Sequence, residues 1–206
     1  MRRKDLLAWA LALRSDSCFP SLWGAASPLS SQHGKQRLSV VIRDYRDSDL
    51  QQVLEVVREL QAYEGELYDR MMPIEDIGGW YVETLLRRCR EERGSLLVSI
   101  RDGKLIGYAT IFTKVEQTGE IDEVPFVYSE VSHIAVKSSA RGTGAGRLLL
   151  DECEHRSRSS GAKWLRINVL ASNGSARRIY EHLGFHDHLV VMEKALLTCT
   201  PFSCRS

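Results

Sequence analysis

The segment that decides the fold is SHIAVKSSARGTGAGRLLL, residues 132–150. It opens with the end of an apolar, β-branched run, Phe126–Val136, which predicts a strand. It closes on apolar residues at helical spacing, which predict a helix from about Ala145 to a stop at Gly161. Glycines lie between the two elements, so the segment predicts a strand, a tight turn and a helix in direct succession.

The glycine-rich turn is a candidate anion site. Gly142, Gly144 and Gly146 leave room for an anion at a helix N-terminus, where unpaired backbone N–H groups and the helix dipole converge. Arg141 and Arg147 flank these glycines and add positive charge. The arrangement is typical of a pyrophosphate site, and the alternative is a merely tight connection between a strand and a helix.

Two common nucleotide-binding motifs do not fit this turn. A Rossmann fingerprint would continue with glycine at position 147, where this chain has Arg147, and with an acidic residue about 20 positions later, where it has Arg166 and Asn168. A Walker A loop requires Gly-Lys-Ser/Thr, which the turn lacks. A nucleotide-binding α/β protein is therefore a minor alternative.

The flanking sequence predicts a mixed order of strands and helices, β-α-α-β-β-β-α-β-α-β. Before the turn we expect a strand at Leu38–Arg43, a helix capped within Asp47–Asp49, a helix at Glu75–Glu92 anchored by Trp80, Leu85 and Leu86, and a hairpin of Ser95–Arg101 and Lys104–Lys114 around Asp102-Gly103. After it we expect a strand at Trp164–Leu170, a helix capped by Asn173 or Ser172 and ended by Gly184, and one or two short strands in Phe185–Leu197.

The composition is that of an ordinary globular chain. Of 206 residues, 43% are hydrophobic and 27% charged, which excludes fibrous and wholly disordered classes. A formal net charge of +1 argues against a dedicated nucleic-acid binder, and no apolar run is long enough to predict a membrane span. The five cysteines are scattered without a C-x-x-C pair, so we expect reduced thiols and no metal site.

The chain divides into one domain and two short ends. Residues 39–197 carry the ordered pattern, residues 198–206 form a short tail, and residues 1–38 are atypical. Arg2, Arg3 and Lys4 precede the apolar run Leu6–Leu13, so this extension is a disordered segment, a cleaved targeting peptide or a short docking helix. We expect a cytoplasmic protein, or an organelle-targeted or exported one if the extension is cleaved.

Two motifs in order resemble the GNAT superfamily of acetyl-CoA-dependent N-acetyltransferases. Arg141-x-x-Gly144-x-Gly146, behind the strand His133–Val136, is similar to that family's acyl-CoA loop. The family's following segment is matched by Asn168, Asn173, Ala176, Tyr180 and Leu183-Gly184-Phe185, and its usual start by Ile42-Arg43 and Asp49. The resemblance covers about residues 39–197.

This resemblance implies an α/β fold with an α+β-like order. We expect a central mixed sheet of six to seven strands, flanked by about four helices and splayed at the fourth and fifth strands, with acetyl-CoA in the wedge. The implied cofactor-binding residues are Ile134, Ala135 and Val136 for the pantetheine, Arg141, Gly142, Thr143, Gly144, Ala145, Gly146 and Arg147 for the pyrophosphate, and Asn173 for the pantetheine or the adenine end.

The implied reaction is direct attack of an amine on the acetyl thioester in a ternary complex. Tyr180 matches the family's general acid, which protonates the departing thiolate, although its place on an apolar helix stripe would also suit a core residue. Glu130 is the candidate base for the amine proton, with His133 as the second candidate and water as the third. Backbone N–H groups near Ile134 and Ala135 would polarise the carbonyl oxygen.

The acceptor is only coarsely specified. Acidic residues gather in the loops expected to line it, namely Glu64, Glu66, Asp69, Glu75 and Asp76, and Glu116, Glu120, Asp122 and Glu123. They would attract a cationic small-molecule or peptide amine, unless they are simply solvated. We expect no nucleic-acid or membrane partner, and apolar edges such as Leu189–Met192 would permit a homodimer. The alternative function is a non-catalytic acyl-CoA-binding or regulatory module.

Overall fold

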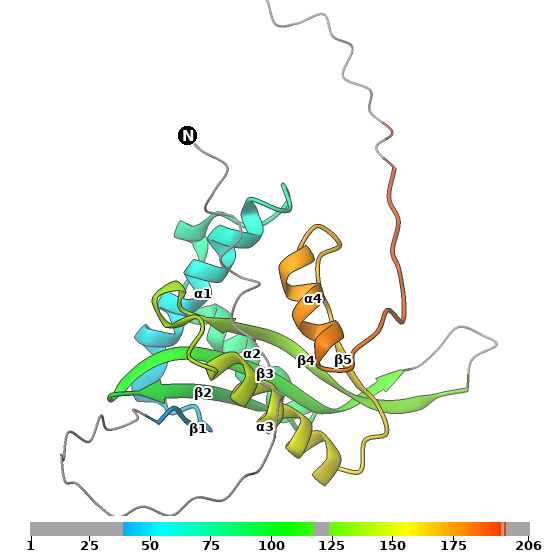
Figure 1. Ribbon diagram of the computed structural model, residues 1–206, viewed down its shortest axis with the longest axis horizontal. Helices are drawn as coiled ribbons and strands as arrows, with labels where there is room; N and C mark the ends of the chain where they lie inside the picture. The colour runs from blue at the N-terminus through cyan, green and yellow to red at the C-terminus, as the bar shows by residue number, and fades with distance from the viewer. Residues whose placement is uncertain (1–38, 118–123, 195, 197–206) are drawn as a thin grey trace, which may run out of the picture.

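The computed structural model describes residues 39–117, 124–194 and 196. Its strands form one mixed sheet in the order β1-β2-β3-β4-β5, in which neighbours from β1 to β4 are antiparallel and β4 and β5 are parallel. The strands are β1 Val41–Asp44, β2 Ser95–Arg101, β3 Lys104–Gln117, β4 Phe126–Val136 and β5 Leu165–Ile167. The predicted mixed α/β class is confirmed (Figure 1).

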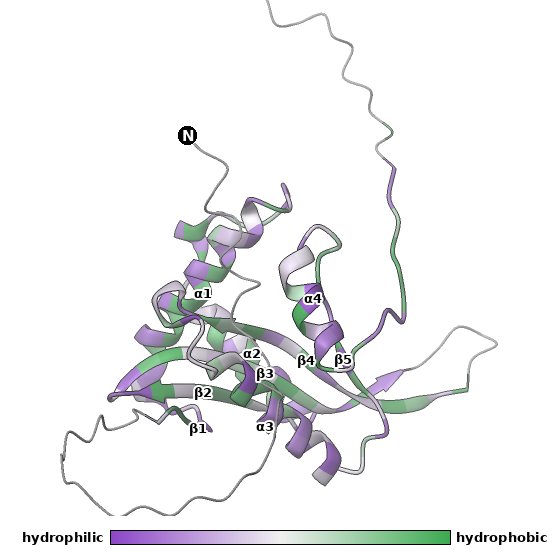
Figure 2. Cartoon of the chain, viewed as in Figure 1, coloured by the Kyte–Doolittle hydropathy of each residue, from purple (hydrophilic) through white to green (hydrophobic). Residues whose placement is uncertain are grey.

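Four α-helices cover the sheet, as predicted. They are α1 Leu50–Gly65, α2 Gly79–Glu91, α3 Ala145–Ser159 and α4 Gly174–His182. One apolar core lies between the sheet and the helices α1 and α2, and includes Val53, Val57 and Tyr108. A second lies on the opposite face under α3 and α4, and includes Leu149 and Val131. Figure 2 shows the resulting pattern, with apolar strands inside and mostly polar outer helix faces.

The connection between β2 and β3 follows its sequence signal. Asp102 and Gly103 both have positive φ, at 53° and 72°, and Arg101 pairs directly with Lys104. Two residues of positive φ form the turn whose twist matches that of an antiparallel hairpin, which is why Asp-Gly predicts it. The hairpin is therefore confirmed.

The second predicted helix begins later than expected. A 3-10 turn spans Ile74–Asp76, and α2 starts only at Gly79 after the extended residue Ile77, because Gly78-Gly79 interrupts the helical pattern. Trp80, expected as an apolar anchor, is 46% exposed, while Val82 and Cys89 are buried with Leu85.

The sheet has five strands in the described part of the chain, not six or seven. No described residue of Phe185–Leu197 is in a strand, so the predicted closing strands are wrong there, and positions 195 and 197 lie outside the described residues. This segment is held by ion pairs of Asp187 with Arg177 and Glu193 with Arg70 rather than by sheet pairing. The four residues Leu189–Met192 are between 67% and 89% exposed.

The predicted extension, residues 1–38, and the tail, residues 198–206, lie outside the described residues. Within the described part, no helix has the length and apolar character required to cross a bilayer. Nor is any group of three or more His, Cys, Asp or Glu side chains there placed to hold a metal ion.

Candidate functional site

The sheet opens between β4 and β5. The two strands pair only from Ser129–Val131 to Leu165–Ile167, and β5 ends there, three residues short of the predicted Leu170. On the edge that pairs with β3, Ser132 of β4 has no partner, because Val131 pairs with Ile111 and His133 pairs with the adjacent residue, Thr110. Such a bulge bends a strand and changes the direction of the groups that follow it. The splay expected at the fourth and fifth strands is therefore present.

The bulge also decides which backbone groups of β4 face the opening. The Lys137 N–H donates to the carbonyl of Ile106, the residue opposite it on β3, at 2.8 Å. Residue pairs of an antiparallel ladder alternate between those that exchange backbone hydrogen bonds and those that do not. Ala135 therefore bonds to β3, while the N–H and C=O groups of Ile134 and Val136 point toward the unpaired edge. Of the three predicted pantetheine contacts, two offer free backbone groups, and Ala135 instead fills the α1–α2 core.

The glycine loop after β4 forms the predicted tight turn into α3. Gly142 and Gly144 have φ values of 76° and 84°, in the left-handed region that favours glycine, and Gly144 directly precedes α3. The first-turn N–H groups of α3 have no partner within the helix, so they are available to an anion. The Thr143 hydroxyl donates to the carbonyl of Ala140 at 2.7 Å and braces the loop.

The start of α3 comes close to β4. A Cβ on Gly146 would lie 3.6 Å from Val136, and Ala145 is buried at this junction. The loop's anion site and the open edge of β4 are therefore adjacent parts of one surface.

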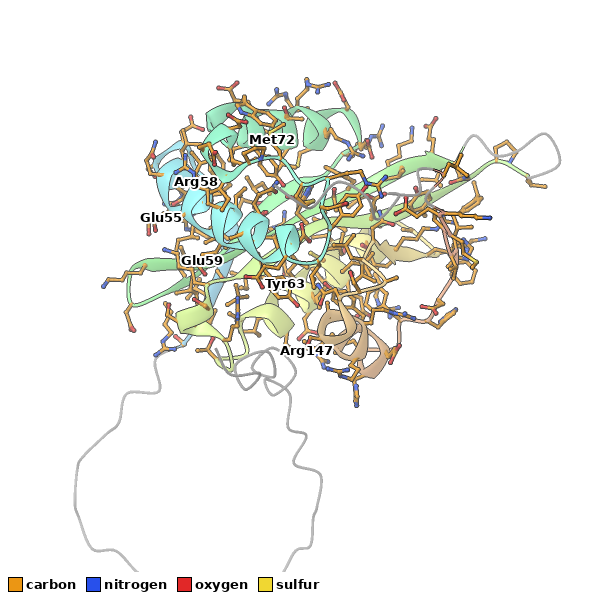
Figure 3. The ribbon with its side chains drawn as sticks, turned by 90° about the horizontal axis from the view of Figure 1, so that it is seen from above. Glu55, Arg58, Glu59, Tyr63, Met72 and Arg147 are labelled. Atoms are coloured by element: carbon orange, nitrogen blue, oxygen red, sulfur yellow. The ribbon has the colours of Figure 1, made fainter. Side chains whose placement is uncertain are left out.

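The side of α1 that faces the loop carries polar residues. Glu55 pairs with Lys137 at 2.6 Å, and Glu59 accepts from the backbone N–H of Ser138 at 2.9 Å. Glu55, Glu59 and Tyr63 follow one another along α1, with Tyr63 at the end nearest α4 (Figure 3). These contacts fix the distance between α1 and the segment that leads into the glycine loop.

The two predicted arginines of the loop have different environments. Burial lowers the pKa of Arg141, while the nearby Glu59 and Tyr63 raise it, so this guanidinium lies between α1 and the loop. Arg147 is half-exposed and pairs with Asp151 one turn later on α3 at 2.7 Å. Figure 3 places Arg147 beside α4.

Asn173 joins α1 to α4. Its side-chain oxygen accepts from the N–H of Ala176 at 3.1 Å, which makes it the helix cap, and from the Tyr63 hydroxyl at 3.3 Å. The Ser172 hydroxyl donates to the carbonyl of Leu67 at 3.3 Å. The oxygen of Asn173 thus has a structural role, and its contact with a cofactor stays a prediction.

Tyr180 lies on the inner face of α4. Its ring packs edge-on against Phe185, with centroids 5.9 Å apart, and against the core under α3. Burial raises its pKa to about 12, and the negative charge of Glu64 raises it further in the same direction. The hydroxyl is therefore protonated at neutral pH, as a general acid must be.

Glu130 has other neighbours than Tyr180. It faces Phe112 across the β3–β4 pair and lies on the α1–α2 side of the sheet. Burial raises its pKa, the charges of Arg88 and Arg166 lower it, and that of Glu92 raises it. Tyr180 is not among the groups that shift it, so the structure does not bring the two predicted catalytic residues into one electrostatic pair.

His133 packs edge-on against Tyr81, with ring centroids 5.7 Å apart. Burial lowers its pKa to about 4, and the charge of Arg88 lowers it in the same direction, so the ring is neutral at pH 7. Its Nδ1 is buried and has no hydrogen-bond partner within the described part of the chain. The role of His133 as an alternative base stays a prediction.

The sequence predicts Glu64 among the acids that line the acceptor, and the structure adds two tyrosines near it that sequence reasoning did not place at the site. Glu64 lies in the last turn of α1, Tyr81 on α2 and Tyr108 on β3. Burial raises the pKa of both tyrosines, and the charge of Glu64 raises it further. In the sequence, nothing distinguishes Glu64 from the other acidic residues of that region. Nothing in the pattern around Tyr81 and Tyr108 separates them from core residues.

The other predicted acidic residues divide into two groups. Glu66, Asp69, Glu75, Asp76 and Glu116 are exposed, and Glu120, Asp122 and Glu123 lie outside the described residues. Only Glu64 of the described set is half-buried, and burial raises its pKa.

Comparison with known proteins identifies a family. A family model described as Acetyltransferase (GNAT) family matches residues 54–185. A mycothiol acetyltransferase from Thermomonospora curvata is 35% identical over 116 residues, which are 55% of this chain and 36% of that protein. An IAA acetyltransferase from Azospirillum brasilense is 29% identical over 143 residues, 69% of this chain and 82% of that protein.

Among solved structures, the BH1408 protein from Bacillus halodurans has a TM-score of 0.68 and 19% identity. The match covers 76% of this chain and 99% of that protein. At this identity the likeness concerns the fold alone. It agrees with the sheet and helix arrangement described above, while this chain spans only about a third of the mycothiol acetyltransferase it matches.

Proposed function

The chain belongs to the acetyltransferase (GNAT) family, and from this premise we propose that it transfers an acetyl group from acetyl-CoA to a primary amine, by direct attack in a ternary complex. One observation carries the proposal. The open edge of β4 and the glycine loop of left-handed conformation are adjacent, so one extended ligand with amides and a pyrophosphate would meet both.

The residues present fit such a ligand. The loop from Gly142 to Arg147 offers backbone N–H groups and the N-terminus of α3 to the pyrophosphate, and Arg141 adds charge beside it. Ile134 and Val136 offer their unpaired backbone groups to the pantetheine amides. Acetyl-CoA supplies the thioester whose carbonyl carbon the amine attacks.

Two groups of the chain then act on the reacting atoms. A backbone N–H of the β4 edge near Ile134 donates a hydrogen bond to the thioester oxygen, where negative charge develops. The Tyr180 hydroxyl donates its proton to the departing sulfur. Because a phenol with a pKa of about 12 is a weak acid toward a thiolate whose acid form titrates near 8.5, this step requires close contact.

The acceptor is proposed as a cationic small-molecule or peptide amine. Exposed carboxylates around the end of α1 and the start of α2, among them Glu66, Asp69 and Glu75, support it by favouring approach of a positive charge. The relatives are named for acetyl transfer to two different acceptors, so they support the reaction class and leave the acceptor to experiment.

Calorimetry and an amine panel test the proposal. We expect the full chain to bind acetyl-CoA and to bind neither NAD nor ATP. With acetyl-CoA and a panel of polyamines, aminoglycosides, amino acids and peptides with free N-termini, we expect release of free thiol with at least one amine. Binding of acetyl-CoA without transfer to any amine would favour the non-catalytic module, and no binding would reject both.

A homodimer stays a prediction. The exposed run Leu189–Met192 is consistent with it, and sedimentation of the full chain is the direct measurement.

A further inference from the structure

We propose that Glu64 is the residue that binds the ammonium group of the acceptor and takes its proton. The inference rests on the proposed function and names the carboxylate that the acceptor meets. It replaces the sequence-based choice of Glu130 for this role.

Four elements of the fold converge on Glu64. The carboxylate lies in the last turn of α1 and is half-buried. Its charge acts on Tyr63 of α1, Tyr81 of α2, Tyr108 of β3 and Tyr180 of α4, and raises the pKa of each beyond the effect of burial. Glu64 therefore lies near Tyr180, the proposed general acid, as well as near the tyrosines of the α1–α2 side.

The contacts between α1 and α4 explain this position. Tyr63, the neighbour of Glu64, donates to Asn173 at the N-terminus of α4, and Ser172 donates to Leu67 two residues after Gly65. The two bonds hold the C-terminal end of α1 against the start of α4. Tyr180 lies about two turns further along α4, and the charge of Glu64 acts on it, although 116 positions separate the two residues in the sequence (180 − 64).

The surroundings of Glu64 favour a cationic guest. The charges of Arg88 and Arg166 lower the pKa of Glu130, whereas burial alone shifts that of Glu64, and no cation of the described residues acts on it. The Tyr108 hydroxyl is fully buried, and the Tyr81 side chain lies within hydrogen-bond reach of it. A half-buried carboxylate among tyrosines is stabilised by a cation, because burial of an unpaired charge is costly and tyrosine rings attract ammonium groups.

The proton transfers balance as follows. The Glu64 carboxylate accepts one proton from the ammonium, and the freed nitrogen lone pair forms a bond to the thioester carbon. The carbon–sulfur bond breaks, its electron pair stays with sulfur, and sulfur receives the Tyr180 proton. The Tyr180 phenolate takes the second nitrogen proton as the amide forms, and Glu64 releases the first to solvent. One ammonium and one thioester thus give one amide, one thiol and one proton.

The test is Glu64→Gln, with Glu83→Gln as the matched control. Glu83 is exposed on α2, and its replacement removes the same charge. For a cationic acceptor we expect kcat of E64Q to fall by about 100-fold or more, while E83Q keeps wild-type kcat. For an acceptor that is uncharged at pH 7, such as an aniline or a hydrazide, E64Q should stay within about threefold of wild type.

Two further readouts separate binding from structure. With CoA in place of acetyl-CoA, so that no turnover occurs, calorimetry should show the Kd of the cationic acceptor rising about tenfold in E64Q. The kcat/KM of E64Q should rise about tenfold per pH unit from pH 7 to 9, since only the free amine then reacts, while wild type changes less. E64Q should unfold no more easily than wild type, because the buried charge is removed.

The outcomes distinguish the two proposals. Equal kcat, acceptor Kd and pH profile in E64Q and wild type would overturn the role of Glu64 and leave the transferase intact. A comparable loss of kcat in Glu130→Gln, with E64Q unaffected, would return the base to Glu130. Failure of wild type to acetylate any amine would overturn the proposed function and this inference with it.

Discussion

Tyr180 combines two properties that a general acid at this position requires. Its ring is fixed by the core under α3 and by Phe185, so the hydroxyl is held in one place. Its pKa of about 12 keeps the proton on the oxygen at neutral pH. Both properties come from burial on the inner face of α4, so the same packing that stabilises the helix prepares the acid.

The replacement Tyr180→Phe tests this residue directly. We expect release of CoA thiol to slow by about 100-fold, because the sulfur would leave without a proton donor. Acetyl-CoA affinity, measured by calorimetry, should change little, because the loop and the β4 edge remain. Tyr45→Phe, a partly buried tyrosine beside α1, is the control and should keep full activity. Full activity in Y180F would remove Tyr180 from the mechanism.

At the scale of elements, α3 carries left-handed glycines at both ends. Gly144 precedes the helix with a φ of 84°, and Gly161 follows it with a φ of 80°. An added Cβ at either position would meet no atom within 4 Å, so only the backbone conformation disfavours substitution. The two sites therefore have the same local constraint, but only Gly144 belongs to the candidate anion site.

The variants Gly144→Ala and Gly161→Ala compare the two positions directly. Each should lower the free energy of unfolding by about 1–2 kcal/mol, because alanine is strained in the left-handed region. Only G144A should weaken acetyl-CoA binding, since the strain is relieved by moving the N–H groups of the loop. Urea unfolding and calorimetry on both variants give the comparison. An equal loss of acetyl-CoA affinity in G161A would show that the effect is one of general stability.

At the scale of the whole molecule, the site lies where the two cores meet the opening of the sheet. Tyr108, Glu64 of α1 and His133, which packs on Tyr81 of α2, are on the α1–α2 side. Tyr180 is on the α3–α4 side. Burial of titratable groups at this junction couples the fold to pH. His133 has the largest effect on the pH dependence of stability near neutral pH, because its ordinary pKa of about 6.5 falls to about 4 in the folded chain.

The sign of this coupling follows from the lowered pKa. Below pH 6.5 the unfolded chain binds a proton at His133 that the folded chain does not bind, so stability is present above that pH and lost as pH falls toward 4. The loss reaches up to about 3 kcal/mol. Chemical unfolding between pH 7 and 4 should show it. His133→Gln should flatten the slope, and His155→Gln, at an exposed position on α3, should not.

The local features of the fold were predictable from short stretches of sequence. The Asp102-Gly103 hairpin and the left-handed glycine loop depend on the φ preferences of a few residues, and the helix cap at Asn173 depends on a side chain that bonds a backbone group three positions later. These interactions span a few positions, so residue order alone determines them. The same applies to the loop as a candidate pyrophosphate site.

The positions of Glu64 and Glu130 were decided only by tertiary structure. In the sequence, both residues are candidate site carboxylates. In the fold, Glu64 acts on Tyr180 of α4, whereas Glu130 faces Phe112 of β3 and has Arg88 and Arg166 nearby. Likewise, β5 ends at Ile167, and Phe185–Lys194 does not pair with the sheet. Such outcomes depend on contacts between residues far apart in the sequence, whose energies no local pattern contains. The sequence therefore determined most of the elements and the acetyltransferase family, and packing between the elements determined which carboxylate lies near Tyr180.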